Sequence, residues 1–595
     1  ATNITGSLNS AVGVSSMRFN TTGSQNVGFG VNALEANTTG DNNTAVGVSA
    51  LGANTTADQN TAIGHSALGA NTTGCRNIAI GYNSLAVNTT GCCNVSIGRT
   101  ALDANTEGDF NTAVGNSALS ENTTADSNTA VGYLSLNANT TGTGNNAFGA
   151  LAGDAITTGS NNTALGFEAA GKLTTGGDNV AVGRAALLDS TTHSGNVAIG
   201  VEALENNTAD ENVAVGKQVL NDNTSGNANT SIGSFALSKN TTASENTAVG
   251  YNSLFTNTTG TRNSALGFRT LCSNTTGGAN VALGNNALFT NSTGDNNIGI
   301  GRDALFANTT ADSNVAVGFC SLAANTTGAA NTAVGSNALD SNTTGYANTA
   351  IGCDAMQTNT TGFSNTAMGE NSLELNTTGD CNVAIGNTAL RANTTANGNT
   401  AVGFSASKCN ATSSQNVAVG FCALFTNTAA GQTAIGHCAL RLATSGYSNT
   451  AVGAFSGDAL TTGNSNVSMG YDSFTDNTTG DCNVALGRGS LANNTTADSN
   501  TAVGACALFT NTTGTPNTAM GFQSLNSNTT GSNNTAIGYQ SLQSNTSGIR
   551  NTAIGHGTLN LNVSGQCNIA IGQVALNKNT ASNNTAIGAN VMEEN

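Results

Sequence analysis

Residues 43–59 read Asn-Thr-Ala-Val-Gly-Val-Ser-Ala-Leu-Gly-Ala-Asn-Thr-Thr-Ala-Asp-Gln, and the same phrase begins again at Asn60. The opening asparagine recurs every 17 residues as far as Asn584, which gives about 35 copies. A repeat this short cannot enclose a core alone and is typical of units that stack into a solenoid. We number the repeat from its opening asparagine, so that Asn43 is position 1 and Gln59 is position 17.

Positions 2 to 4 predict a short β-strand. They hold Thr or Val, then Ala, then Val or Ile in most copies, and Gly at position 5 ends the run, as in residues 111–115. β-Branched residues favour strands, and successive strand residues point to opposite faces. Because positions 3 and 4 are both apolar, we expect both faces of the strand to be covered. Ala and Leu at positions 8 and 9 form a second apolar pair, and Asn-Thr-Thr-Gly at positions 12 to 15 predicts a turn.

The uninterrupted repetition predicts one continuous array over residues 1–595, with no internal domain boundary. Residues 1–6 match the second half of a repeat, and the chain stops partway through another, so we expect uncapped ends and a segment of a longer chain. The net charge of -17 disfavours nucleic acids and anionic membrane surfaces as partners. No apolar run approaches the roughly 18 residues of a membrane-spanning helix, so no membrane insertion is expected.

Three copies are one residue short, and they show where the chain tolerates a deletion. They begin at Asn196, Asn416 and Asn568, and each loses its residue after position 13. A one-residue slip inside a strand would exchange its two faces, whereas a loop absorbs it. The outer turn of the coil is therefore expected after position 13.

A second natural variation concerns positions 9 and 12. In three copies the Asn at position 12 is replaced by a large apolar residue, and the Leu at position 9 is lost at the same time. The exchanged pairs are Gly153 with Ile156, Ala170 with Leu173, and Gly457 with Leu460. Such compensation of volume is expected of a close-packed interior. We infer that both positions share one core site and that the usual Asn points inward.

The inward asparagines at position 12 are predicted to form a structural ladder from coil to coil, bonded to each other and to carbonyl groups of the turn. Its members include Asn37, Asn54, Asn71 and Asn88. The same residues begin Asn-Thr-Thr, which matches the acceptor motif for N-glycosylation. A glycan on these asparagines is the alternative to the structural ladder.

The strands at residues 179–183, Asn-Val-Ala-Val-Gly, and 382–386, Asn-Val-Ala-Ile-Gly, resemble the Asn-Ser-Val-Ala-Ile-Gly strands in the heads of trimeric autotransporter adhesins. The full repeat also resembles arrays in tail-fibre-like proteins of phages and bacteria. The resemblance implies a left-handed parallel β-roll with three chains packed side by side, hence a homotrimer or a higher filament. The 17-residue period is longer than that of the adhesin heads.

Two sets of side chains recur at equal positions in adjacent copies. Cys75 and Cys92 would lie about 5 Å apart in stacked coils; free thiols are the expectation, and a disulfide, which this spacing suits, is the alternative. Acidic residues at position 16 pair in the same way; we expect solvated turn acids and no cofactor, and a bridging calcium ion is the alternative. The candidates for such a calcium site are Asp41, Asp58, Asp109 and Asp126.

Aromatic residues gather at position 6, after the strand, and phenylalanines at position 10. They could form a sugar-binding ridge, but packing at corners between subunits is the simpler expectation. The position-6 residues include Tyr82, Tyr133, Phe167, Tyr251, Phe268, Phe404, Phe522 and Tyr539. The four histidines lie far apart along the array without a nucleophile beside them, so catalysis is not expected.

Together these features predict an all-β fold, a parallel β-solenoid of about 35 coils and roughly 170 Å in length. The function expected is a structural extracellular fibre or shaft on a bacterial cell, a phage or a virus, presenting adhesion or receptor binding to surface glycans or a host receptor. A polysaccharide-binding spike is the alternative, and an ice-binding solenoid with threonine ladders is a further one. Positions 6, 7, 10, 11, 16 and 17 are expected to vary freely.

Overall fold

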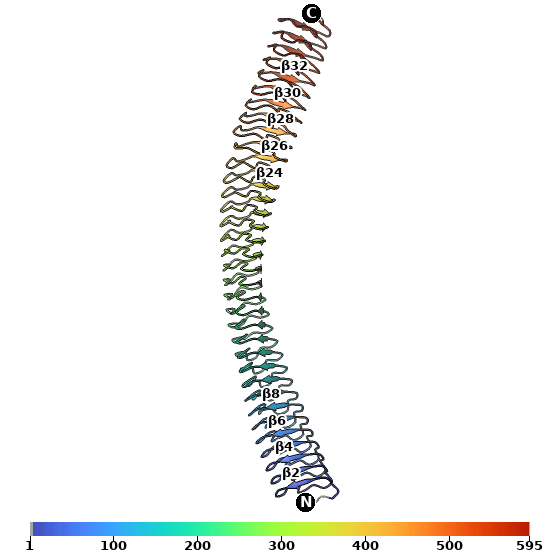
Figure 1. Ribbon diagram of the computed structural model, residues 1–595, viewed down its shortest axis with the longest axis vertical. Coiled ribbons are helices and arrows are strands. Elements are labelled where there is room, and N and C mark those ends of the chain that lie inside the picture. Colours follow the sequence, from blue (N-terminus) through green and yellow to red (C-terminus); the bar gives the residue numbers. More distant parts are fainter. Residues whose placement is uncertain (1–3, 594–595) are drawn as a thin grey trace. The chain divides into compact units, whose positions relative to one another are not determined.

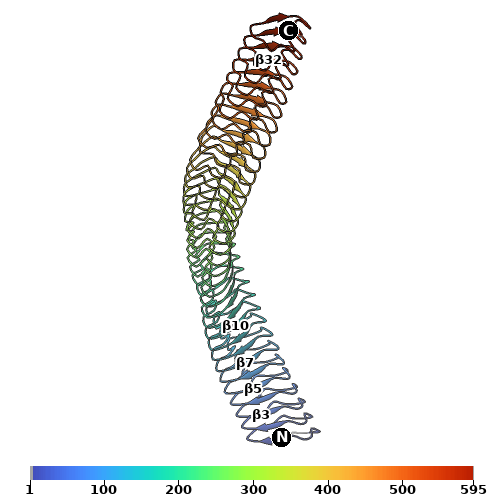
Figure 2. The same cartoon turned by 45° about the horizontal axis from the view of Figure 1, so that its top comes forward.

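A computed structural model describes residues 4–593 of the chain. The chain divides into two units, residues 1–296 and 297–595, and each is a stack of coils with one three-residue strand per coil (Figures 1 and 2). The fold prediction of a parallel β-solenoid with a 17-residue repeat is confirmed. No helix within residues 4–593 is long and apolar enough to cross a bilayer.

The strands occupy positions 2 to 4 of the repeat, as expected from the sequence. In the first unit they are β1 (Ser10–Val12), β2 (Val27–Phe29), β3 (Thr44–Val46), β4 (Thr61–Ile63), β5 (Ile78–Ile80), β6 (Val95–Ile97), β7 (Thr112–Val114), β8 (Thr129–Val131), β9 (Asn146–Phe148), β10 (Thr163–Leu165), β11 (Val180–Val182), β12 (Val197–Ile199), β13 (Val213–Val215), β14 (Thr230–Ile232), β15 (Thr247–Val249), β16 (Ser264–Leu266) and β17 (Val281–Leu283).

The second unit repeats this arrangement. Its strands are β18 (Ile298–Ile300), β19 (Val315–Val317), β20 (Thr332–Val334), β21 (Thr349–Ile351), β22 (Thr366–Met368), β23 (Val383–Ile385), β24 (Thr400–Val402), β25 (Val417–Val419), β26 (Thr433–Ile435), β27 (Thr450–Val452), β28 (Val467–Met469), β29 (Val484–Leu486), β30 (Thr501–Val503), β31 (Thr518–Met520), β32 (Thr535–Ile537), β33 (Thr552–Ile554), β34 (Ile569–Ile571) and β35 (Thr585–Ile587).

Within each unit, neighbouring strands pair in parallel and residues at equal repeat positions face each other. Thr44 pairs with Thr61 across one full repeat. The first short copy keeps this register, because Val197 pairs with Val213 and Ile199 with Val215. The missing residue is therefore absorbed in the turn, as predicted.

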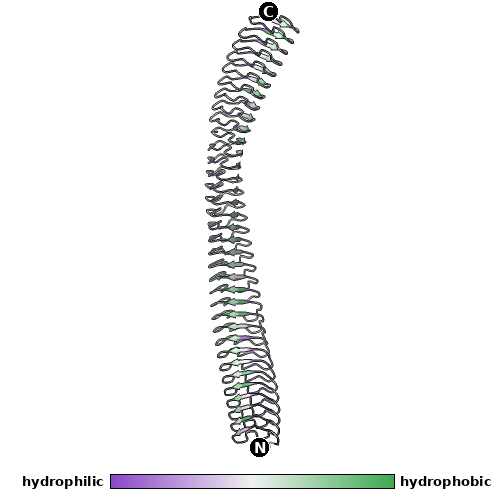
Figure 3. Ribbon diagram, turned by 45° about the vertical axis from the view of Figure 1, so that its right-hand side comes forward, coloured by the Kyte–Doolittle hydropathy of each residue, from purple (hydrophilic) through white to green (hydrophobic). Residues whose placement is uncertain are grey.

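The core lies on one side of the sheet only. Ala at position 3 and Ala and Leu at positions 8 and 9, such as Ala45, Ala50 and Leu51, are fully buried. Positions 2 and 4 point to the other side, where Val46 is half-buried and Ile63 is 40% exposed. The expectation that both faces are covered is therefore wrong for the single chain. In Figure 3 the hydrophobic colour lies mainly along the strands.

The arc from position 5 to position 12 is a series of tight turns with left-handed residues. Ser49 and Leu51 have φ angles of 56° and 51°. This conformation lets alternate backbone N–H groups bond within and between coils: Ala50 N–H donates to Gly47 O at 3.4 Å, and Leu51 N–H donates to Ala67 O in the next coil at 3.0 Å. A left-handed leucine costs roughly 1–2 kcal/mol, which the inter-coil bond and full burial of the side chain offset.

Glycine at position 5 is required by the stacking. Gly47 has a φ of 139°, and a Cβ atom on it would lie 2.3 Å from the carbonyl oxygen of Gly64 in the next coil. No side chain fits that distance.

The side chains at positions 9 and 12 occupy the same space, which explains their exchange. A Cβ atom on Gly153 would lie 2.9 Å from Cδ1 of Ile156, and Ile156 is fully buried. The two positions therefore share one core site, as the sequence predicted.

Candidate functional site

The uncovered side of the sheet forms a continuous apolar surface in each unit. We call positions 2 and 4 of the strands the outer stripe. Position 4 is Val, Ile, Leu, Phe or Met in every strand from β1 to β35. Among these residues Phe148 and Leu266 are 43% and 49% exposed. The single chain thus leaves a row of large apolar side chains in water.

The outer stripe is hollowed at β15 to β17. A depression of about 320 Å³ lies there between Val249, Leu266 and Leu283 at position 4 and Ser264 and Val281 at position 2. Ser264 lacks the methyl groups that Val281 carries one coil later, which contributes to the hollow. Its walls are almost entirely apolar, which suits an apolar side chain rather than a polar ligand.

One edge of the outer stripe is the column at position 6, where each strand ends. The aromatic residues of this column stack on their neighbours: the rings of Tyr251 and Phe268 are 5.6 Å apart at 15°, and those of Tyr539 and His556 are 5.0 Å apart at 7°. Nearly parallel rings cover each other's faces and leave their edges in water. Because sugars stack on ring faces, this arrangement favours the packing role over the sugar-binding ridge.

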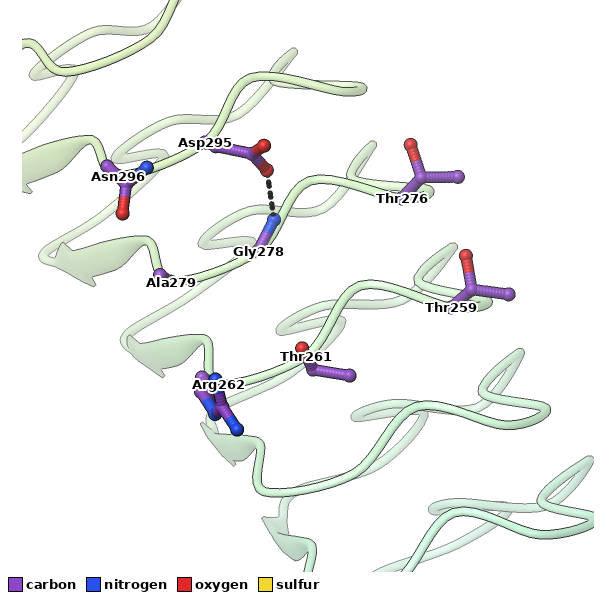
Figure 4. A pocket seen from close by; sticks show the side chains of 8 residues that line it. All are labelled: Thr259, Thr261, Arg262, Thr276, Gly278, Ala279, Asp295 and Asn296. Carbon is purple, nitrogen blue, oxygen red and sulfur yellow. Dashed lines mark hydrogen bonds between the residues drawn. The ribbon is translucent and has the colours of Figure 1, made fainter.

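The other edge is the column at position 17, one residue before the opening asparagine. Arg262, Ala279 and Asn296 lie one above another at the beginnings of the strands in Figure 4. Polar members of this column bond along it: Arg262 Nε donates to Glu245 Oε2 at 2.8 Å. The position-17 residues have left-handed backbones, such as Arg262 with a φ of 60°.

Position 16 varies, as expected, and holds Ala329, Phe363 and Ile549 in three of the coils, but in many others it carries a hydrogen-bond acceptor. In those coils its side chain accepts the backbone N–H of position 16 in the preceding coil. Gly278 N–H donates to Asp295 Oδ1 at 2.7 Å beside a polar hollow of about 290 Å³ (Figure 4). Asp, Asn and Ser recur at this position, and each supplies an oxygen acceptor. Where one of them is present, the residue links two coils.

The four calcium candidates take part in the same links. Asp41 N–H donates to Asp58 Oδ1 at 2.6 Å, and Asp109 N–H donates to Asp126 Oδ1 at 2.7 Å. One oxygen of each acceptor carboxylate is thus engaged by the backbone. Within residues 4–593 no three His, Cys, Asp or Glu side chains gather in a way that could hold a metal ion.

The asparagines at position 12 lie inside the coil stack. Asn37 is fully buried, and its Nδ2 donates to Asn20 Oδ1 at 2.7 Å and to Gly40 O at 3.0 Å. The same two bonds recur in the following coils. Asn54, Asn71 and Asn88 repeat them. Because Nδ2 is buried and donates to protein acceptors, it has no room for a glycan in the folded chain.

A second asparagine ladder, at position 1, was not inferred from the sequence. Asn43 N–H donates to Asn26 Oδ1 at 2.9 Å, and Asn43 Nδ2 donates to Ala57 O at 2.8 Å. The constancy of Asn at position 1 is the signal that could have revealed it, since Thr or Ser would not reach both acceptors.

Cys75 and Cys92 lie beside each other with free thiols. Their Sγ atoms are 3.3 Å apart, and Cys75 N–H donates to Cys92 Sγ at 3.1 Å. The hydrogen bond to Cys92, together with burial, raises the pKa of the Cys75 thiol. The pair occupies position 16, so a thiol here replaces the usual oxygen acceptor.

No protein-family model matches the chain, and no curated protein matches its sequence.

Proposed function

We propose that the chain is a structural fibre or shaft whose copies associate side by side through the outer stripe. The observation that carries this proposal is the large apolar residue at position 4 of every strand, on the face that the single chain leaves in water. Contiguous apolar patches beyond a few hundred Å² are rare on monomeric proteins and mark interaction surfaces.

The length of the outer stripe supports a stable contact. The stripe runs along all 17 strands of the first unit, so a partner beside it would cover apolar side chains in every coil. A second copy of this chain carries a surface of the same length and period, which no unrelated partner would match.

Three copies with their outer stripes turned toward a common axis are the arrangement that the resemblance to adhesin heads implies, with the left-handed coil. The aromatic column at position 6 then lies at the corners between copies. Such an assembly would serve as a shaft on a cell or virion surface that presents a binding function elsewhere in the fibre. Ladders of buried asparagine and leucine through most of the coils support a mechanical role.

The proposal is tested by sedimentation equilibrium of the chain at micromolar concentration and by electron microscopy. We expect an oligomer for the natural chain and a monomer for the double variant Ile63→Lys/Ile97→Lys, which places two charges in the outer stripe. The matched control is Thr56→Lys/Thr73→Lys, on the exposed turn of neighbouring coils, which keeps the oligomer. Circular dichroism establishes that both variants fold. A monomeric natural chain would refute the proposal.

A further inference from the structure

The two ends of the strands carry side chains of matching chemistry. Position 17 precedes the strand and position 6 follows it, so residues six apart in the sequence flank the same strand. Six residues at position 17 are charged. With their position-6 counterparts they form the pairs Arg76 and Tyr82, Asp178 and Arg184, Glu211 and Lys217, Glu245 and Tyr251, Arg262 and Phe268, and Arg550 and His556.

The chemistry is complementary in five of the six pairs. All three arginines at position 17 are matched by an aromatic ring, and two of the three acids by a cation. Arginine on an aromatic ring and opposite charges are both favourable contacts, and Tyr and Arg are enriched at the anchors of interfaces. No pair combines like charges.

The two members of a pair lie at opposite edges of the outer stripe. Glu211 and Lys217 are separated by Asn212, β13 and Gly216, and six residues of extended chain span up to about 20 Å. Both side chains are exposed. A contact within one coil therefore does not explain the match of Glu211 with Lys217. Arg184, in contrast, already pairs with Glu202 of the next coil in the same chain, so the contact is tested at Glu211 and Lys217.

A shift by one coil removes both acid–cation matches. Toward the C-terminus, Asp178 would face Val201, and Glu211 would face Ser234. Toward the N-terminus, Asp178 would face Phe167, and Glu211 would face Val201. The arginines do not distinguish the two heights, because after the N-terminal shift they would still face aromatic rings, those of His65, Tyr251 and Tyr539. The two acid–cation pairs therefore carry the equal-height register.

We propose that copies of this chain lie parallel at equal height, with the position-17 edge of one copy against the position-6 edge of its neighbour. The contact joins two different edges, so it continues around an axis along the coil stack and closes into a ring. The outer stripes are then enclosed, and the flanking columns fix the register between copies. This inference rests on the proposed self-association and adds the register, the orientation and the residues that set them.

Carbodiimide cross-linking of mixed light and ¹⁵N-labelled chains, folded together, tests the contact. The reagent joins a carboxylate to a lysine amine in direct contact. We expect Glu211–Lys217 links that combine a light and a heavy peptide. The control is Lys239, whose Nζ lies 2.8 Å from Asp222 Oδ2 in the same chain and which should link within one isotope only.

The outcomes separate the two proposals. Associated chains without mixed Glu211–Lys217 links would overturn the edge-to-edge register and leave the fibre proposal standing. Chains that sediment as monomers would overturn the fibre proposal and the register with it. Mixed links at Glu211 and Lys217 in associated chains support both.

Charge exchange gives an independent readout. Glu211→Lys places two cations at the contact and should weaken association by about three- to tenfold, and the double variant Glu211→Lys/Lys217→Glu should restore it. A double variant as weak as the single variant would contradict the pairing. Both residues are exposed, so neither change disturbs the core.

Discussion

Replacing Asn71 by alanine is expected to open the stack locally, because this side chain joins three coils. Asn71 Nδ2 donates to Asn54 Oδ1 at 2.9 Å and to Gly74 O at 2.8 Å, and its Oδ1 accepts from Asn88 Nδ2 at 2.8 Å. Gly74 O keeps a bond from Asn60 Nδ2, and Asn88 Nδ2 keeps its turn carbonyl. Only Asn54 Oδ1 loses its side-chain donor outright.

The magnitude follows from these contacts. Three lost hydrogen bonds at about 0.5–1.5 kcal/mol each and one orphaned buried acceptor at about 1–3 kcal/mol give a local loss of about 2.5–7.5 kcal/mol. Within residues 4–593 the natural chain shows the orphaned state at Asn139, Asn393 and Asn562, whose Oδ1 atoms have no partner; after Asn139 the next ladder residue is the apolar Ile156.

The matched variant is Leu68→Ala/Asn71→Leu, which copies the natural exchange at Ala170 and Leu173. This double variant also leaves Asn54 Oδ1 without its donor, but the new leucine fills the core site. The local free energy of opening should therefore fall by at least about 1 kcal/mol less than in Asn71→Ala. Hydrogen exchange of the amides in residues 54–91 measures both losses, because a solenoid opens locally between neighbouring coils. If the free energy of opening of Asn71→Ala lies within about 0.5 kcal/mol of that of the natural chain, the ladder does not stabilise the stack as argued.

Three further predictions concern the core, an acid and the thiols. Leu204 is fully buried, so Leu204→Asp should destabilise its coils by more than about 4 kcal/mol in hydrogen exchange, whereas Thr56→Asp on the exposed turn should change little; equal effects would contradict the core assignment. Burial raises the pKa of Asp340 above its unfolded value, so its contribution favours folding at low pH and is lost as the pH rises through the folded pKa. Asp340→Asn should therefore raise the melting temperature at pH 7 and weaken its pH dependence, and an unchanged pH profile would argue against this. Oxidised glutathione should link Cys75 to Cys92, close a 17-residue loop and stabilise it by about 3 kcal/mol; peptide mapping that finds both thiols free would contradict the expectation.

The sequence predicted those features that depend on volume and period. Ala113 and Val114 mark a strand with two faces, and the exchange of Gly153 with Ile156 places position 12 inside. Both are visible because side-chain size must be conserved in a packed core.

Features that depend on backbone geometry could not be predicted in this way. Leucine rarely adopts a positive φ, so nothing in the sequence indicates that Leu51 does. The bond that Asp58 accepts from Asp41 N–H arises only once two coils are stacked, and alone each acid resembles a solvated turn residue. The face left uncovered by a single chain is likewise set by the path of the arc.

The residue types found at position 4 show whether strand preference or burial explains the outer stripe. Threonine suits an exposed strand position, and position 2 uses it often, as in Thr44 and Thr61. Position 4 never holds threonine in any strand but accepts Leu165, Phe148 and Met368, which are not β-branched. Strand preference alone would admit threonine and disfavour methionine. The tolerance of size together with the exclusion of hydroxyls is the pattern of a buried position, which supports the proposed contact between outer stripes of neighbouring copies.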